Sequence, residues 1–266
     1  MLPPLSAFIA ALQGTGFAFL MTVLGSALVL LPGKAVRPGI ERMSLGFAAG
    51  IMIAASVWSL LIPAIDEAGK AGGAGWIPAA GGFAAGVAAL LLFDALLPHL
   101  HPTEATPEGP KTHLPKTVLL VFAVTLHNIP EGMSVGLSYA FAALGSDPGA
   151  LSAAGALALG IGIQNIPEGF AVALPLRTAG KGRLRAFLGG ALSGAVEPLF
   201  GLAVVLAAPL IAPVMPWMLS FAAGAMMYVV VEELIPAAHL DSKRHDGTLS
   251  ILAGFTLMMV LDTAFG

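Results

Sequence analysis

A short motif that contains a carboxylate occurs twice in an apolar part of the chain. Residues 127–132 read His-Asn-Ile-Pro-Glu-Gly, and residues 164–169, 37 positions later, read Gln-Asn-Ile-Pro-Glu-Gly. The polar side chains of the two copies are His127, Asn128, Glu131, Gln164, Asn165 and Glu168. In a helix, residues four positions apart lie on one face, so each copy presents its first residue and its glutamate together. The asparagine is rotated from its neighbour by about 100°.

These side chains have the donor atoms that a divalent metal ion needs. Two carboxylates offset the charge of the ion, while imidazole and amide groups complete the coordination shell without adding charge. This mixture suits zinc, iron, manganese or cadmium better than soft copper(I). Amides are weak ligands, which favours a protein that must release the ion it binds.

Each copy also has a proline directly before its glutamate. Pro130 and Pro167 cannot donate a backbone hydrogen bond, which frees the carbonyl oxygens of Leu126 and Ile163. In a membrane, a freed carbonyl must be satisfied by water, a side chain or an ion. The sequence therefore predicts two helices broken or kinked at these prolines, with the two glutamates facing each other around a metal ion.

The composition indicates a membrane protein. Of 266 residues, 57% are hydrophobic and 10% charged, and the mean hydropathy is +0.90. Such a chain is expected to have apolar stretches of about 20 residues, each able to span a bilayer. A glutamate at mid-membrane costs roughly 2.5–3.5 kcal/mol, so two of them in one repeated motif favour a functional site over helix packing. The chain has no cysteine, which excludes thiolate metal sites and disulfides.

We predict an all-α, polytopic fold with eight transmembrane helices. The spans cover residues 6–31, 44–64, 78–98, 117–140, 151–176, 187–211, 217–237 and 248–265. Of the 12 Lys and Arg residues, all but Lys70 fall in the links after spans 1, 3, 5 and 7. Because cytoplasmic loops are enriched in basic residues, both termini are expected outside the cytoplasm. One transporter domain covers residues 1–266, with a cytoplasmic loop at about 99–116.

Two four-residue sequences occur in both halves of the chain, and this internal echo predicts an inverted repeat. Span 2 contains Phe-Ala-Ala-Gly at 47–50 and Leu-Ile-Pro-Ala at 61–64, and span 7 contains the same two sequences at 221–224 and 234–237. The two spans run in opposite directions in the predicted topology. We therefore expect spans 1–3 and 6–8 to form an inverted repeat around a central pair, spans 4 and 5. Transporters built in this way bind their substrate between the repeats, near the middle of the membrane.

Pairs of glycines four residues apart predict close helix crossings, because small residues let backbones approach. The pairs are Gly46/Gly50, Gly82/Gly86, Gly132/Gly136 and Gly190/Gly194.

The doubled motif on spans 4 and 5 resembles the signature of the ZIP (Zrt/Irt-like) divalent-metal transporters, of the bacterial type. The resemblance extends over the whole chain: span count, external termini, the loop after span 3 and the inverted repeat. It implies a metal site that can be binuclear. One ion would be bound by His127, Glu131, Gln164 and Glu168, and the other by Asn128, Asn165, Glu197 and the same two glutamates as bridges. Many members have His at position 164 and some have Asp at position 165, so metal preference and double occupancy stay open.

Three further acidic residues are candidates. Glu197 lies within span 6, directly before Pro198, and the family position makes it a metal ligand. Asp94, at the end of span 3, and Glu233, in span 7, would lie on an exit path toward the cytoplasm. For these two, ordinary interfacial polarity is an equal alternative.

The resulting hypothesis is transport of a divalent cation, zinc before iron, manganese or cadmium, toward the cytoplasm. The protein would be a multi-pass protein of the cell (inner) membrane, without enzyme activity or prosthetic group. Its partners would be metal ions and the lipid bilayer, not nucleic acid. The oligomeric state stays open, with a homodimer as one alternative.

Two other readings are weaker. An intramembrane metal-dependent hydrolase would need two or three nitrogen ligands for zinc, but the motif has one histidine and no His-Glu-x-x-His sequence occurs. A structural or sensory protein would hold a metal ion that does not exchange.

Overall fold

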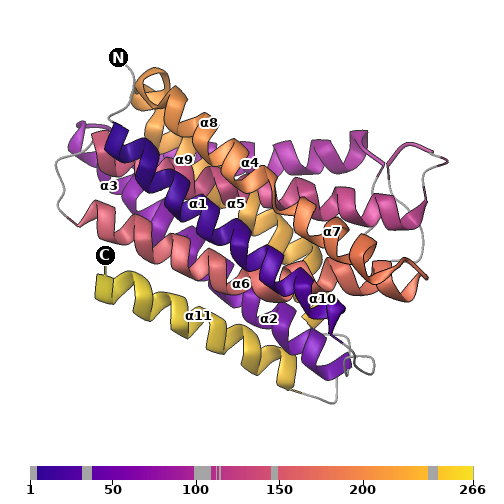
Figure 1. Ribbon diagram of the computed structural model, residues 1–266. Coiled ribbons are helices and arrows are strands. Elements are labelled where there is room, and N and C mark those ends of the chain that lie inside the picture. Colours follow the sequence, from indigo (N-terminus) through magenta and orange to yellow (C-terminus); the bar gives the residue numbers. More distant parts are fainter. Residues whose placement is uncertain are drawn as a thin grey trace.

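The computed structural model describes residues 5–31, 38–98, 109–111, 113, 115–144, 149–238 and 245–265, and these residues form helices and no strands (Figure 1). The elements are α1 (Leu5–Ala27), η1 (Leu28–Leu30), α2 (Pro38–Ala55), η2 (Ser56–Leu61), α3 (Ile62–Lys70), α4 (Trp76–Leu96), α5 (Lys116–Leu144), α6 (Ala150–Thr178), α7 (Arg183–Ser193), α8 (Val196–Ile211), η3 (Ala212–Val214), α9 (Met215–Val229), η4 (Val230–Leu234), α10 (Ile235–Ala238) and α11 (Asp246–Phe265). The predicted all-helical, multi-pass membrane class is confirmed. The predicted loop at 99–116 lies mostly outside the described residues.

Six stretches of the described chain are long and apolar enough to cross a membrane. One of them, Arg183–Ala238, has 56 residues, far more than the roughly 20 that a bilayer needs. It runs along the molecule through α7 and α8 and returns through α9 and α10 (Figure 1). The predicted number of eight passes stays a prediction.

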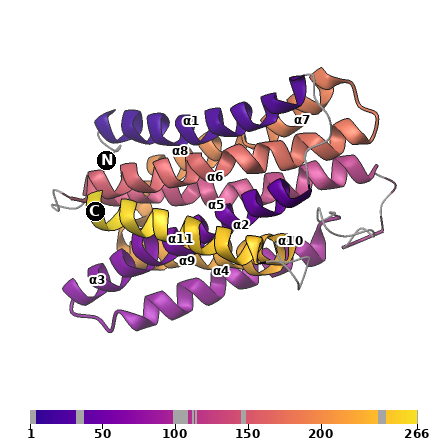
Figure 2. The same ribbon diagram turned by 90° about the horizontal axis from the view of Figure 1, so that it is seen from below.

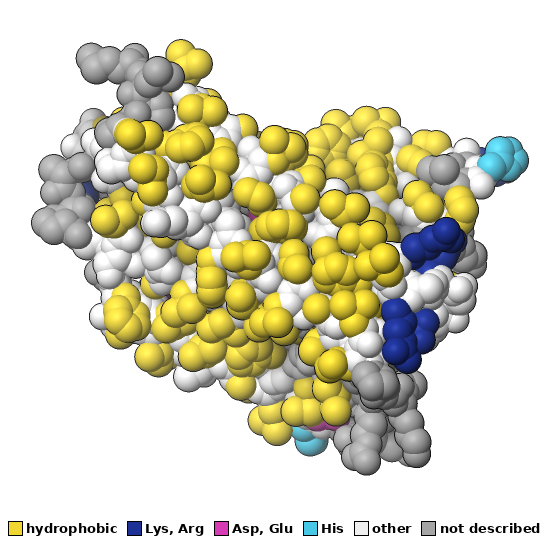
Figure 3. Space-filling model, viewed as in Figure 1, with side chains coloured by type: hydrophobic (Ala, Val, Ile, Leu, Met, Phe, Trp, Pro, Cys, Tyr) yellow, Lys and Arg dark blue, Asp and Glu magenta, His cyan; other side chains and the backbone are white. Residues whose placement is uncertain are grey.

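The surface suits a lipid environment. Large apolar side chains are exposed along the helices, for example Leu210 at 84%. Apolar side chains cover most of the face seen in Figure 3, while most Lys and Arg side chains on that face gather at the end opposite the start of α1 and the end of α11. This separation agrees with the uneven distribution of basic residues along the sequence.

The helices form two groups (Figure 2). In one group α1 packs on α6 and α5 packs on α8, and α5 also contacts α6. In the other group α2 packs on α11 and α4 packs on α9. Contacts between the groups, chiefly α2 with α6 and α5 with α9, are less extensive. The expected central pair, α5 and α6, therefore shares its group with the first span and with α8.

The packing supports the predicted inverted repeat. A Cβ on Gly50 would overlap the backbone of Ile251 in α11, and a Cβ on Gly224, its counterpart in the echo, would overlap the backbone of Phe83 in α4. Each glycine follows Phe-Ala-Ala, and α2 and α9 run in opposite directions (Figure 1). The helix pairs α2–α11 and α9–α4 are therefore built on matching contacts.

A further similarity lies in the backbone. Span 2 contains the π-helical turn η2, and span 7 contains the π-helical turn η4. Each turn ends at the leucine of its Leu-Ile-Pro-Ala sequence. Such turns widen an α-helix locally and are frequent at functional sites. In this chain, η4 carries Glu233, one of the predicted site residues.

The predicted close crossings are confirmed. At each glycine of the four predicted pairs, a Cβ would lie closer to an atom of a neighbouring helix than packed atoms normally approach. Gly132, within the first motif, faces the backbone of Glu197. This contact fixes the depth at which α5 and α8 meet.

Candidate metal centre

The two motifs lie in the middle of α5 and α6, the contacting helices of the first group. Both helices continue through Pro130 and Pro167, so the expected break in the helix is not observed. A proline inside a helix is tolerated where neighbouring helices and polar side chains surround the freed carbonyl groups.

A small pocket of about 40 Å³ lies between α5, α6 and η4. It is lined by His127, Glu131, Glu168 and Glu233, and the rest of its lining is mainly apolar. Both glutamates of the doubled motif thus face one space, together with a third carboxylate from the second group of helices. Glu131 is 1% exposed, so its carboxylate is shielded from bulk water.

The amides of the motif make only part of their hydrogen bonds. Gln164 Nε2 donates to Glu131 Oε1 (3.0 Å), and Asn128 Nδ2 donates to the carbonyl oxygen of Ser193 (2.9 Å). Five buried oxygen atoms of the two motifs have no hydrogen-bond partner: Asn128 Oδ1, Glu131 Oε2, Gln164 Oε1, Asn165 Oδ1 and Glu168 Oε1. Buried acceptors without partners are costly, and a cation is the species that several acceptors can share.

Glu197 lies next to the second motif. It is fully buried at the start of α8, and Asn165 Nδ2 donates to its Oε2 atom (2.8 Å). Its Oε1 atom accepts a hydrogen bond from Thr22 Oγ1 (3.1 Å), on α1. Four helices therefore meet around this carboxylate and the motifs: α1, α5, α6 and α8.

The two residues predicted on the exit path differ in their surroundings. Glu233 Oε1 lies 2.6 Å from His127 Nε2, so the structure joins it to the motif. Asp94, on α4, instead accepts a hydrogen bond from the hydroxyl of Tyr228 on α9 and does not line the pocket.

Within the described residues, no three His, Asp or Glu side chains lie close enough together to hold a metal ion by themselves. A bound ion would need amide oxygens as well, or a movement of side chains into the pocket. The five oxygens without hydrogen-bond partners are the atoms available to coordinate such an ion.

The chain is similar to known proteins over almost its whole length. The family model described as ZIP zinc transporter matches residues 110–262. The chain is 36% identical to zinc transporter ZIP11 of Homo sapiens, over 98% of each chain, and 37% identical to zinc transporter GufA of Myxococcus xanthus, over 97% of this chain and 99% of GufA. It is 39% identical to zinc transporter ZIPB of Bordetella bronchiseptica, over 96% of this chain and 81% of ZIPB.

The chain belongs to the ZIP zinc transporter family. The resemblance of the doubled motif is thereby confirmed, and the family relation supports metal-ion transport as the general function. The residues that bind the ion in this ZIP protein stay a prediction.

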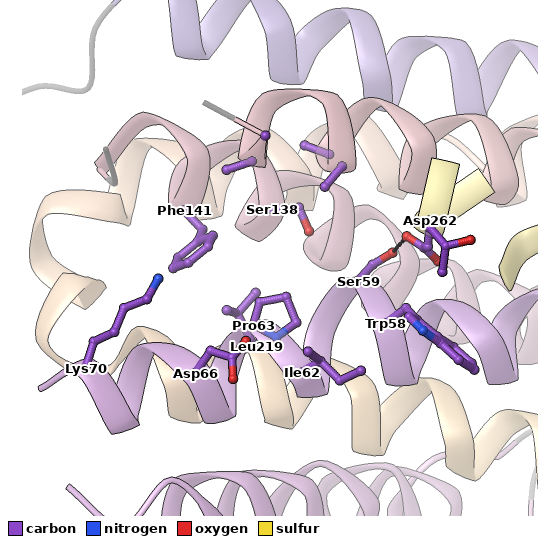
Figure 4. Close-up of a pocket in the computed structure, with 15 residues that line it drawn as sticks. Trp58, Ser59, Ile62, Pro63, Asp66, Lys70, Ser138, Phe141, Leu219 and Asp262 are labelled. Atoms are coloured by element: carbon purple, nitrogen blue, oxygen red, sulfur yellow. Dashed lines mark hydrogen bonds between the residues drawn. The ribbon is translucent and has the colours of Figure 1, made fainter. Parts of the chain in front are cut away.

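This ZIP protein has a second, larger cavity of about 390 Å³ near the end where α11 terminates. Asp66, Lys70, Ser138 and Asp262 contribute to its lining (Figure 4). Ser59 Oγ donates to Asp262 Oδ1 (2.5 Å), while Asp262 Oδ2 is buried without a partner. A mainly apolar cavity with two aspartates in its lining therefore lies on the other side of the motifs from Glu233.

Sequence reasoning missed two polar neighbours of the site, Thr22 and Ser193. Each has one polar side chain on an apolar helix, and the local sequence does not distinguish it from an ordinary packing residue. Tyr228, the partner of Asp94, was missed for the same reason. Gly132 and Gly169 occupy equivalent positions in the two motifs and make equivalent contacts. Gly132 faces the backbone of Glu197, and Gly169 faces the backbone of Thr22, so the second motif points to Thr22 as the first points to Glu197.

Proposed function

We propose that the chain transports zinc toward the cytoplasm through a site formed by the two motifs and α8. Iron, manganese and cadmium are the alternative substrates that the same donors accept. The observation that carries the proposal is the presence of five buried oxygens without hydrogen-bond partners in the motifs of two contacting helices, α5 and α6. The buried carboxylates of Glu197 and Glu233 contact residues of the same motifs. The relatives named zinc transporters support zinc as the ion.

The first ion would be bound by His127, Glu131, Gln164 and Glu168. For this, the amide of Gln164 turns its Oε1 atom toward the ion, and Glu131 is released from its hydrogen bond with Nε2. Glu168 already has an oxygen without a partner in the pocket. The imidazole of His127 would leave its contact with Glu233 and bind the ion instead.

A second ion would lie between the first ion and Glu197. Its ligands would be Asn128, Asn165 and Glu197, with Glu131 and Glu168 as bridges. Asn128 and Asn165 each have a buried Oδ1 atom without a partner, which is the amide atom that binds a cation. Two cations would share three carboxylates, so the charge would be nearly balanced.

The path would run from the outer cavity, past the motifs, to Glu233 at the basic end. Asp66 and Asp262 in the outer cavity would attract cations. Relative displacement of the two helix groups, which meet less extensively than helices within each group, would open the site to each side in turn. A doubly charged ion gains about 4.6 kcal/mol per 100 mV of inside-negative potential, so uptake needs no ATP.

The test is zinc uptake into proteoliposomes that contain the purified protein, with an inside-negative potential. Glu131→Ala and Glu168→Ala are expected to reduce the uptake rate to the level of empty vesicles. Glu67→Ala removes a half-buried carboxylate on α3 that lines neither the pocket of the motifs nor the outer cavity, and it serves as the matched control, with uptake unchanged. Uptake by both motif variants at the wild-type rate would end the proposal.

A further inference from the structure

A groove separate from the metal site lies between α5, the end of α6 and α7. Its volume is about 400 Å³. It lies at the end of the molecule where basic residues gather, and none of its lining residues lines the pocket of the motifs.

One side of the groove is apolar. Val118 and Phe122 are 46% and 37% exposed, lie one turn apart on α5 and contribute to this wall, and Leu176 from α6 closes it. The opposite helix, α7, contributes glycine at position 189, and a Cβ there would meet Leu176 Cδ1 at 2.5 Å. The absence of a side chain at this position keeps the groove open.

The other end of the groove is basic. Lys181, in the link between α6 and α7, and Arg185, in the first turn of α7, both line it and are exposed. Neither side chain has a hydrogen bond or ion pair in the part of the chain that the structure describes. Gly189 lies one turn further along α7 than Arg185, so the basic side chains lie at the start of α7 and the glycine lies deeper in the groove.

We infer that this groove binds one anionic phospholipid of the surrounding leaflet. The phosphate group would pair with Lys181 and Arg185, and one acyl chain would lie along Val118, Phe122 and Leu176. Basic pockets between transmembrane helices are suited to anionic head groups, because the charges are near the membrane surface and the acyl chains need an apolar wall. A soluble phosphate compound would use only the basic end, and a zwitterionic lipid would lack the net charge. The inference does not depend on which ion is transported.

The experiment is native mass spectrometry of the full chain released from detergent micelles, with phosphatidylglycerol or phosphatidylcholine of the same acyl chains added. We expect one retained phosphatidylglycerol and at least a fivefold lower affinity for phosphatidylcholine. Lys181→Gln and Arg185→Gln are each expected to weaken phosphatidylglycerol binding by about fivefold, which corresponds to roughly 1 kcal/mol per basic residue at a membrane surface. Arg183→Gln, on the same helix but outside the groove, is the matched control and should bind as wild type.

A second variant tests the apolar wall without changing the charge. Val118→Trp introduces a large side chain at an exposed position of the groove and is expected to lower phosphatidylglycerol binding to a similar extent. Glycerol phosphate added in excess should not displace the lipid. The inference is overturned if the two lipids bind equally, if the double variant of Lys181 and Arg185 retains phosphatidylglycerol, or if glycerol phosphate displaces it.

Discussion

His127 Nε2 lies 2.6 Å from Glu233 Oε1, a contact that joins the first motif on α5 to the π-helical turn η4. The two residues belong to different helix groups, and both line the small pocket that also contains Glu131 and Glu168. In the proposed mechanism, displacement of the two groups would separate His127 from Glu233 and free Glu233 for another partner. Glu233 is therefore suited to receive an ion that leaves the motifs.

The first prediction concerns this contact. Replacing Glu233 by Gln removes one negative charge from the pocket and is expected to raise the zinc KM of uptake about tenfold, or roughly 1.4 kcal/mol. Glu232→Gln is the matched control, because the neighbouring side chain is exposed. The measurement is the concentration dependence of zinc uptake in proteoliposomes, and equal KM values for both variants would contradict the assignment.

The second prediction concerns Thr22, which donates a hydrogen bond to Glu197 from α1. Thr22→Val keeps the shape of the side chain but leaves a buried carboxylate oxygen without its donor, at a cost of about 1–3 kcal/mol. We expect the carboxylate to reorient and the second of the two proposed zinc ions to be lost, so that zinc bound per purified chain falls from two toward one. Thr15→Val is the control, because Thr15 donates its hydrogen bond to the carbonyl oxygen of Ala11 in its own helix. A zinc content of two per chain in both variants would remove Thr22 from the site.

The third prediction concerns the repeated helix contacts. Gly254→Ala places a methyl group against the backbone of Phe47, and Gly86→Ala places one against the backbone of Phe221. Phe47 and Phe221 are the first residues of the two Phe-Ala-Ala-Gly sequences. Overpacking of this kind costs about 1–3 kcal/mol, and both variants should lower the Tm in detergent by at least about 3 °C. Gly155→Ala meets no atom of another element and should leave the Tm unchanged or raise it. A decrease in only one of the two variants would argue against equivalent contacts in the two halves.

The fourth prediction concerns metal preference. Gln164→His replaces an amide by an imidazole at a fully buried position of the motif. Imidazole favours zinc, whereas manganese prefers oxygen donors, so the ratio of zinc to manganese uptake in competition should rise about tenfold. Gln13→His, on the exposed side of α1, is the control. An unchanged ratio would indicate that Gln164 does not touch the ion.

Local sequence was sufficient for the membrane class, the doubled motif and the close glycine crossings. Hydropathy over a span, the spacing of four residues along a helix and the presence of glycine are properties of neighbouring positions. The Phe-Ala-Ala-Gly and Leu-Ile-Pro-Ala echo extended this to the repeat, and the matching contacts of Gly50 and Gly224 support it. A break of the helix at Pro130 and Pro167 was wrong, since α5 and α6 both continue through their prolines.

The partners of the motif depend on which helices cross and at what depth. Thr22 lies 175 positions from Glu197, and no local pattern relates a threonine on one apolar helix to a carboxylate on another. The same holds for Glu233, whose local sequence was equally compatible with an interfacial residue. Asp94, the other residue predicted on the exit path, accepts a hydrogen bond from Tyr228 and does not line the pocket. Residue types along the chain specify which donors are available for a metal ion, but the order and depth of helix packing select those that meet.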